Sequence, residues 1–376
     1  MQYQSTVFGQ LLKELPRGWF ARAASRHHRG RRKRGLEPWA HLVSMVFAQL
    51  SGARGLREVE RALERQDGVL AHLGMGRVRR STLGDANADR PAGLFEEVAG
   101  YLAGRLAGRG AGREALRLID ATRIFAGKRV EQWSRGALKL HVVFDPHAER
   151  PTCFVVTSER VTDIAVAKTM PIEPGATYVF DRGYYDFGFW ARLAEQSCRF
   201  VTRLKSNSPT QVLEERPASA RGILFDRVVQ LSQRLASRRS NPMSRPVRMI
   251  GVKIDSGREI TLLSNDLDAS ATTIAELYKA RWQVELFFKW IKQNLKIAHF
   301  FGTSPNAAAI QIMTALIAFL LLRAAQVRCQ ASIGLQAIAR LMPGFILTRR
   351  SLHALLNAPN PSPGPSQPWQ IELAYA

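Results

Sequence analysis

The sequence predicts a mixed α/β fold in which a helical domain precedes a mixed-sheet core that carries a β-rich insertion. Three observations lead to this prediction. Apolar residues recur at helical spacing in the first 110 residues, and β-branched and aromatic segments, two of them ending on Asp, follow up to residue 205. After a β-rich stretch at 206–265, helical spacing returns. This order is typical of a sheet with helices on its faces.

The chain is strongly basic. Its 376 residues include 54 Lys and Arg against 31 Asp and Glu, a formal net charge of +23. Such a charge opposes compaction unless a polyanion balances it, so nucleic acid is the natural partner. Membrane surfaces and ribosomes also attract cations, but this charge is spread along the chain and not confined to one amphipathic helix. An extended footprint on double-stranded DNA fits that distribution better.

Cysteine usage and hydropathy bear on the compartment. The three cysteines, Cys153, Cys198 and Cys329, are far apart and show no CxxC spacing, so neither a disulfide framework nor a zinc finger is predicted. The longest largely apolar run, 312–322, is shorter than the ~20 residues that a membrane span needs, and no signal-peptide pattern is present. We expect a soluble cytoplasmic protein without a membrane partner.

The N-terminal segment is predicted to be helical, with apolar spacing at 39–50 and 56–63. Ahead of these helices, the basic run at 27–34 fits either a segment that lies along DNA phosphates or a solvated loop. Further on, Ser81 follows three arginines and is expected to cap a helix whose first turn faces DNA. Periodicity does not separate a helix-turn-helix unit from an ordinary helical bundle.

The middle of the chain predicts a β-β-β-α-β-α-β order. Strands are expected at 116–120, 137–144, 152–156, 177–181 and 199–204, with a helix at 163–170 and a second helix after 181. Asp120 and Asp181 each end an apolar strand, and strand ends are where sites open in such sheets.

The remaining third contains short strands and then helices. Strands are expected at 227–231, 247–254 and 259–263, helices at 271–297 and 306–328, and a disordered Pro- and Ser-rich tail. The predicted divisions are a helical DNA-binding domain at 1–110, a core at 111–205 and 266–300, a β-rich insertion at 206–265, a C-terminal helical region at 301–357 and a tail at 358–376.

One predicted helix carries an unusual set of polar residues. With Tyr278 taken as zero and ~100° per residue, Arg281 falls near ~300°, Glu285 near ~340° and Lys292 near ~320°, on one narrow face. A carboxylate beside a guanidinium, an ammonium and a phenol suits a surface that meets a metal ion and a phosphodiester. Geometry alone supports equally an amphipathic helix whose Glu and Lys form surface pairs.

These four residues resemble the Y-(2)-R-(3)-E-(6)-K signature of bacterial transposases of the insertion-sequence-four type. Two further blocks are similar to the family's acidic blocks: Leu-Ile-Asp-Ala-Thr at 118–122 and Phe-Asp-Arg-Gly-Tyr at 180–184. The stretch 136–141 resembles the strand after the first Asp, and the first hundred residues resemble the helical domain of some members. The resemblance implies an RNase H-like catalytic core with a β insertion between the second Asp and the Glu. The longer interval leaves room for it, at 104 positions (285 − 181) against 61 (181 − 120).

The resemblance implies a DDE transposase that cleaves DNA at transposon ends and transfers strands into target DNA. Asp120, Asp181 and Glu285 are then the catalytic residues and the ligands of two Mg²⁺ ions, with Asp120 bridging and Mn²⁺ able to substitute. Because transposition brings two ends together, a homodimer on DNA, associated with the bacterial nucleoid, is also expected.

The same helix supplies the expected DNA contacts. Arg281 and Lys292 would bind phosphates near the scissile bond, and Tyr278 would donate a hydrogen bond to a phosphate oxygen. Two interpretations are open for Trp282. It could stack on a base flipped out of the duplex, or it could pack inside the protein, which is the more frequent role of a Trp in this position. Two other carboxylates are expected to serve local structure, Asp163 as a helix cap and Asp186 in a turn.

Two competing hypotheses remain open. One is a non-catalytic DNA-binding protein derived from a transposase, which the net charge and the helical N-terminal segment also fit. The other is a general RNase H-like nuclease that cuts without end specificity, against which the Tyr-Arg-Glu-Lys helix argues.

Overall fold

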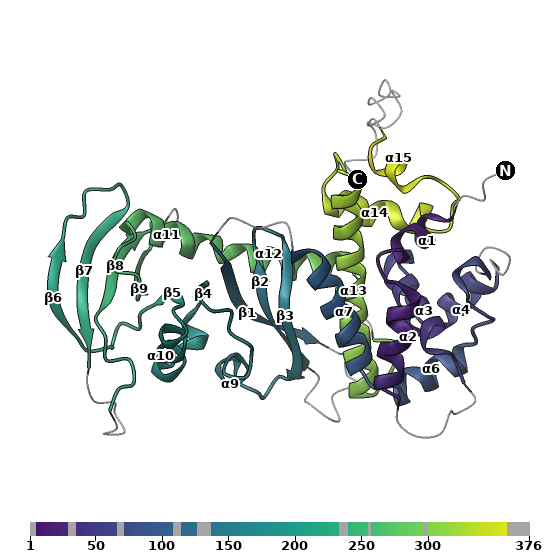
Figure 1. Cartoon of the computed structure of the whole chain (residues 1–376), viewed down its shortest axis with the longest axis horizontal. Helices are drawn as coiled ribbons and strands as arrows, with labels where there is room; N and C mark the ends of the chain where they lie inside the picture. Colours follow the sequence, from purple (N-terminus) through teal and green to yellow (C-terminus); the bar gives the residue numbers. More distant parts are fainter. Residues whose placement is uncertain are drawn as a thin grey trace, which may run out of the picture.

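The computed structural model describes residues 5–28, 35–65, 71–107, 114–125, 137–232, 240–254, 257–295 and 300–358. A twisted sheet forms one end of an elongated molecule and a bundle of helices the other (Figure 1). The described residues leave out most of the basic run at 27–34, residue 136 at the start of the stretch 136–141, the end of the helix expected at 271–297, and the tail from 359.

The N-terminal part is helical, as predicted. Its helices are α1 (Val7–Leu12), α2 (Arg17–Arg26), α3 (Pro38–Ser51), α4 (Leu56–Glu64), η1 (Ala71–Leu73), α6 (Arg80–Asp89) and α7 (Gly93–Arg105). Helix α3 begins with Pro38 in its first turn and ends at Gly52, whose φ of 76° is the left-handed conformation that terminates helices. The predicted cap at Ser81 is wrong, because α6 begins one residue earlier and has no side-chain cap.

The sheet has nine strands in the order β3-β2-β1-β4-β5-β9-β8-β7-β6. The strands are β1 (Leu116–Phe125), β2 (Ala137–Asp145), β3 (Arg150–Ser158), β4 (Thr177–Phe180), β5 (Arg199–Arg203), β6 (Thr210–Arg216), β7 (Ile223–Leu231), β8 (Val247–Lys253) and β9 (Glu259–Ser264). Strands β1, β4 and β5 run parallel to one another, and β2, β3 and β9 are antiparallel to their neighbours. The predicted order of elements along the core, β-β-β-α-β-α-β, is confirmed.

The β-rich stretch extends the core sheet through the antiparallel pairing of β5 with β9. Strand β6 at the outer edge was not predicted. Its sequence, Thr-Gln-Val-Leu-Glu-Glu-Arg, lacks apolar alternation because the strand is exposed on both faces.

Helices cover both faces of the sheet. On one face, α11 (Ala271–Ala280) and α12 (Trp282–Asn294) pack on inward residues such as Leu118 and Val142. On the other face, α9 (Asp163–Ala167) and α10 (Phe187–Glu195) pack on Ile119 and Phe180. Figure 1 shows these two layers on opposite sides of the strands. Consecutive strand residues therefore face different cores, which decides where each carboxylate points.

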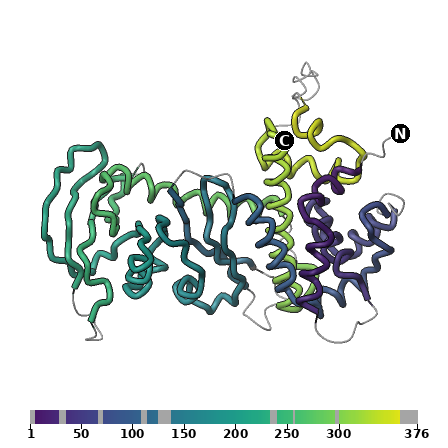
Figure 2. Tube along the Cα trace, viewed as in Figure 1, coloured from purple at the N-terminus to yellow at the C-terminus, as the bar shows by residue number. Residues whose placement is uncertain are grey.

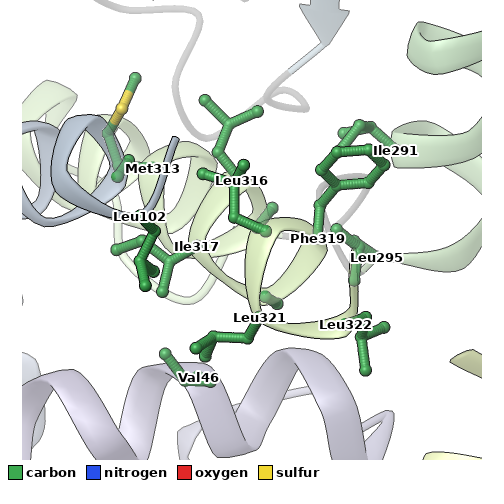
Figure 3. Packing of buried hydrophobic residues seen from close by; sticks show 14 of the residues in the cluster. Val46, Leu102, Ile291, Leu295, Met313, Leu316, Ile317, Phe319, Leu321 and Leu322 are labelled. Atoms are coloured by element: carbon green, nitrogen blue, oxygen red, sulfur yellow. The ribbon is translucent and has the colours of Figure 1, made fainter. Parts of the chain in front are cut away.

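Helix α13 (Pro305–Arg328) joins the two ends of the molecule. It packs on α3 and α7 from the N-terminal part and on α12 and α14 (Leu335–Phe345). Figure 3 shows its Leu316, Ile317 and Phe319 among Leu102 and Ile291. In Figure 2 the N-terminal helices lie beside the C-terminal ones, which end with α15 (Leu352–Leu356). The N-terminal helices and the sheet thus share one continuous hydrophobic core.

Helix α13 is also long and apolar enough to cross a membrane by length and composition, with a mean hydropathy of 2.0 over its most apolar window. In the structure, 89% of that window is buried inside the protein. A helix buried to this extent is a core helix. It carries apolar residues on all of its sides because protein surrounds it.

Buried His41 on α3 makes the stability of the helical part depend on pH. Its Nε2 bonds Asn87 Oδ1 at 2.7 Å, and burial, together with the charge of Arg90, lowers the pKa of His41 to about 3. Between pH 6.5 and 3 the unfolded chain binds a proton that the folded chain does not bind, so stability falls as pH falls.

We therefore expect wild type to lose ~2 kcal/mol more than a His41→Gln variant between pH 7 and pH 5, at ~1.36 kcal/mol per unit below 6.5. Urea unfolding of both proteins at each pH gives the difference, from which groups common to both cancel. A difference that does not change with pH would contradict the assignment.

Candidate active site

Asp120 and Asp181 lie side by side, although only Asp181 follows the end of its strand, because β1 continues past Asp120 to Phe125. Strands β1 and β4 are parallel, and their last paired residues are Ile119 and Phe180. Asp120 and Asp181 follow these two residues directly. Because Ile119 and Phe180 face the α9 and α10 layer, the next residue on each strand faces the α11 and α12 layer.

The predicted helix at 271–297 is divided at Arg281 into α11 and α12. The Arg281 amide bonds Tyr278 O and the Val284 amide bonds Arg281 O, so this turn is tightened to three-residue hydrogen bonds. The turn keeps Arg281 and Glu285 together. The Arg281 guanidinium donates to Glu285 at 2.6 Å and to Asp120 at 3.4 Å. The structure thus brings the first Asp and the Glu together across 165 positions (285 − 120) through one guanidinium.

Asp120 and Glu285 line a pocket of about 410 Å³. Its lining consists of Asp120, Ala121, Thr122, Glu285, Phe288, Lys289, Lys292 and Gln293. Lys292 Nζ donates to Thr122 Oγ1 at 2.6 Å, and burial lowers the pKa of Lys292. Sequence reasoning missed Thr122, Lys289 and Gln293 as parts of this pocket. The spacing of Lys289, four residues after Glu285 on the same helix, was the signal that could have found it.

The carboxylates near the pocket are candidates to hold a divalent cation. Burial raises the pKa of Asp120 to about 6, and the charges of Asp181 and Glu285 add to the rise, while the Ala121 amide and Arg281 oppose it. A bound cation would relieve this repulsion, and carboxylate oxygens are the ligands that Mg²⁺ and Mn²⁺ prefer. Within the described ranges, no three acidic, His or Cys side chains are grouped closely enough to hold a metal ion as they stand. Glu285 is instead paired with Arg281.

Tyr278 and Trp282 take different positions. Tyr278 is half-buried, with the Arg281 guanidinium carbon 5.7 Å from its ring centroid, and burial raises its pKa. Trp282 is 57% exposed, and Leu286, one turn further along α12, is 49% exposed. The packing role favoured for Trp282 is therefore wrong. Its indole is free to meet a partner of the protein.

Two further carboxylates differ from expectation. Asp163 is the first residue of α9 and caps nothing, and its Oδ1 accepts a hydrogen bond from Lys139 Nζ at 2.9 Å. Asp186 is the cap, because its Oδ1 accepts the Phe189 amide at the start of α10, and Lys168 pairs with its other oxygen. The roles predicted for the two residues are thus wrong for Asp163 and incomplete for Asp186.

Comparison with known proteins agrees with this architecture. The transposase DDE domain family matches residues 111–321, and a domain family of unknown function matches residues 3–76. A Sinorhizobium fredii protein named as a transposase, y4zB, is 40% identical over 305 residues, covering 78% of this chain and 85% of the relative. A Geobacillus stearothermophilus protein, named as a transposase for insertion sequence element IS5377, is 32% identical over 216 residues, covering 55% of this chain and 56% of the relative.

A solved structure of the piggyBac transposase synaptic complex with hairpin DNA aligns with 94% of this chain and 81% of its own, at a TM-score of 0.46 and 12% identity. That likeness is too weak to carry an argument.

A mixed sheet that places Asp120 on β1 and Asp181 just after the parallel strand β4, with Asp120 linked to Glu285 through Arg281, fits an RNase H-like core with a DDE set of acidic residues. The chain belongs to the bacterial insertion-sequence transposases with a DDE domain. The insertion-sequence-four signature at Tyr278, Arg281, Glu285 and Lys292 is consistent with this family.

Proposed function

We propose that the protein is a cut-and-paste transposase that cleaves DNA at the ends of its element and joins them to target DNA. Asp120, Asp181 and Glu285 are the proposed catalytic residues and the ligands of two Mg²⁺ ions, with Mn²⁺ as a substitute. The observation that carries the proposal is the bridging of Asp120 and Glu285 by Arg281 at the pocket, with Asp181 directly after the adjacent parallel strand.

When bound, the two cations supply Lewis acidity that activates water or a 3′ hydroxyl and stabilises the leaving 3′ oxygen. The side chains supply the rest. Lys289 and Lys292 give the pocket a positive wall for the DNA backbone, and Arg281 offers a planar fork that matches a phosphate. The ring of Tyr278 lies next to Arg281, whose guanidinium carbon is 5.7 Å from the ring centroid. Exposed Trp282 extends the same surface along α12 and offers a face for base stacking.

The helical part is the proposed reader of the transposon ends. Helix α4 carries exposed Arg57 and Arg61, and Arg79 and Arg80 are exposed at the start of α6. Arginine side chains of this kind bind phosphates and add affinity that falls with salt. We propose that this domain, at 1–110, binds the terminal inverted repeats, and that two copies act together on paired ends.

End specificity tests the proposed function. Purified protein with Mg²⁺ is expected to cleave a duplex that carries the inverted repeat flanking its gene, and to join that end to a supercoiled target plasmid. A scrambled duplex of equal length should stay intact. Equal cutting of both duplexes would indicate a general nuclease instead, and binding without cleavage would indicate a DNA-binding protein derived from a transposase.

Gly183 is expected to control the position of Asp181. The Gly183 amide donates to Asp181 Oδ1 at 2.7 Å, and a Cβ at position 183 would lie 3.0 Å from that same oxygen. Gly183→Ala should displace the carboxylate by a few tenths of an ångström and reduce cleavage about ten-fold, because catalytic rates are sensitive to such misplacement. The matched control is Gly100→Ala on α7, where a Cβ meets nothing within 4 Å. Equal cleavage rates in the two variants would contradict this role of Gly183.

A further inference from the structure

An ion pair lies behind the acidic site, on the opposite face of the sheet. Lys139 on β2 is 9% exposed, and its Nζ donates to Asp163 Oδ1 and to Val161 O, both at 2.9 Å. These two bonds tie the start of α9 to β2. Since β2 pairs with β1 from Ala137 to Phe144, α9 is fixed to the strand that carries Asp120.

Helix α9 also contacts the turn that carries Asp181. Asp181 is the cap of the short turn η4 (Arg182–Tyr184), and α9 packs directly on this turn. Asp163 Oδ2 lies 3.6 Å from the point where a Cβ on Gly183 would stand. Asp163 therefore accepts a hydrogen bond from Lys139 of β2 with Oδ1, and its Oδ2 lies near Gly183 in the turn that carries Asp181.

Two buried polar groups point to the same place. Tyr184 is 1% exposed, and its hydroxyl has no hydrogen-bond partner among the described residues. The charges of Asp120, Asp163 and Asp181 all act on this phenol, and with burial as the main cause they raise the pKa of Tyr184 well above its usual value. The hydroxyl therefore keeps its proton.

His141 lies beside Asp163 on the same face of the sheet. Thr157 Oγ1 donates to Ser158 O, so it accepts from His141 Nε2 at 2.9 Å. The proton of His141 is then on Nε2, and its Nδ1 lies 3.7 Å from Asp163 Oδ1 without a donor. Asp163 Oδ1 thus lies close to both Lys139 and His141 behind the acidic site.

We propose that Lys139 and Asp163 form a positioning pair that holds the Asp181 turn at a fixed place relative to Asp120. The pair works through α9 and adds a second link to the direct pairing of β1 with β4. Neither residue lines the pocket of the acidic site. This inference rests on the proposed role of Asp181 as a metal ligand, and groups that orient metal ligands typically change metal affinity by about 10–100-fold when removed.

The test is Mn²⁺ binding to the purified full chain by calorimetry, with thermal unfolding recorded for each protein. Lys139→Met and Asp163→Asn are both expected to weaken Mn²⁺ binding about ten-fold or more. Lys139→Arg, which keeps the charge and can still donate to Asp163, should recover most of the affinity. The matched control is Lys168→Met, which removes a Lys–Asp pair of 2.7 Å just after the same helix and should leave Mn²⁺ affinity unchanged.

Mn²⁺ affinity within two-fold of wild type in folded Lys139→Met and Asp163→Asn would overturn the proposal, whatever their melting temperatures. If Lys139→Met does not fold, Asp163→Asn and Lys139→Arg decide the outcome, because they keep a polar group at each position. DNA cleavage by wild type is measured separately. Absent cleavage with intact, Lys139-dependent Mn²⁺ binding would refute the proposed transposase activity and leave the positioning pair standing.

Discussion

Glu285→Gln is expected to reduce cleavage of transposon-end DNA by about 10³-fold or more, which corresponds to about 4 kcal/mol of transition-state stabilisation. The substitution keeps the size of the side chain and removes the charge needed to hold a cation. The fold should survive, because Glu285 is one-third exposed and its bond to Arg281 is an i,i+4 pair worth well under ~1 kcal/mol at such a site.

The measurement is the initial rate of end cleavage with saturating Mg²⁺, with DNA affinity measured in parallel. Glu276→Gln on α11 is the matched control, since Glu276 is exposed and lies outside the pocket. Glu276→Gln should cleave like wild type. A Glu285→Gln protein that retains a tenth or more of the wild-type rate would show that Glu285 does not hold a catalytic cation.

Arg248→Met is expected to destabilise the protein by about 3–5 kcal/mol, the largest stability effect of a single substitution that we predict. Arg248 on β8 bonds both oxygens of Asp226 on β7, at 2.7 and 2.6 Å, and the two side chains are 5% and 3% exposed. Removing the guanidinium leaves a buried carboxylate unpaired. Arg248 also donates to Leu267 O and Ala269 O in the segment before α11, so the loss reaches the helix that carries Tyr278.

Urea unfolding of Arg248→Met and of Arg227→Met measures this effect. Arg227 forms a comparable 2.7 Å pair with Glu215 in the same sheet, but its two side chains are 35% and 58% exposed, so its loss should cost less than ~1 kcal/mol. Adding Asp226→Leu to Arg248→Met should recover part of the stability, because the unpaired charge is then gone. Similar losses in the two arginine variants would contradict the assignment of the buried pair.

The sequence predicted the parts of the fold and site that depend on local pattern. Apolar runs that stop on a carboxylate predicted strand ends at Asp120 and Asp181. This is confirmed for Asp181, which follows β4, and wrong for Asp120, because β1 continues to Phe125; the parallel pairing of β1 with β4 still places the two side by side. The spacing of Arg281 and Glu285 predicted that they share a helix face, and they are bonded in the structure.

What the sequence did not predict depends on contacts between distant segments. The division of the helix at Arg281 coincides with the bond from Arg281 to Asp120, 161 positions away. Asp163 at the start of α9 pairs with Lys139 on strand β2, so its position at a helix start suggested a cap that does not exist. Trp282 is exposed on α12, and apolar character alone suggested packing.

The place of the helical parts could not be predicted for the same reason. Periodicity predicted that α3 and α13 are helices, but it did not predict that they pack on each other, because this depends on contacts between segments far apart in the sequence. The long apolar run of α13 reflects its position between the N-terminal helices and α12, where protein covers nearly every side.

The most direct test of the central claim is an end-cleavage assay with wild type and Asp181→Asn, each with Mg²⁺, Mn²⁺ or EDTA, on a labelled duplex that bears the inverted repeat flanking the gene. We predict cleavage at the repeat boundary by wild type with either metal, none with EDTA, and none by Asp181→Asn despite equal DNA binding. Cleavage by Asp181→Asn at the wild-type rate, or cleavage that persists in EDTA, would contradict the assignment of Asp120, Asp181 and Glu285 as a metal-dependent catalytic centre.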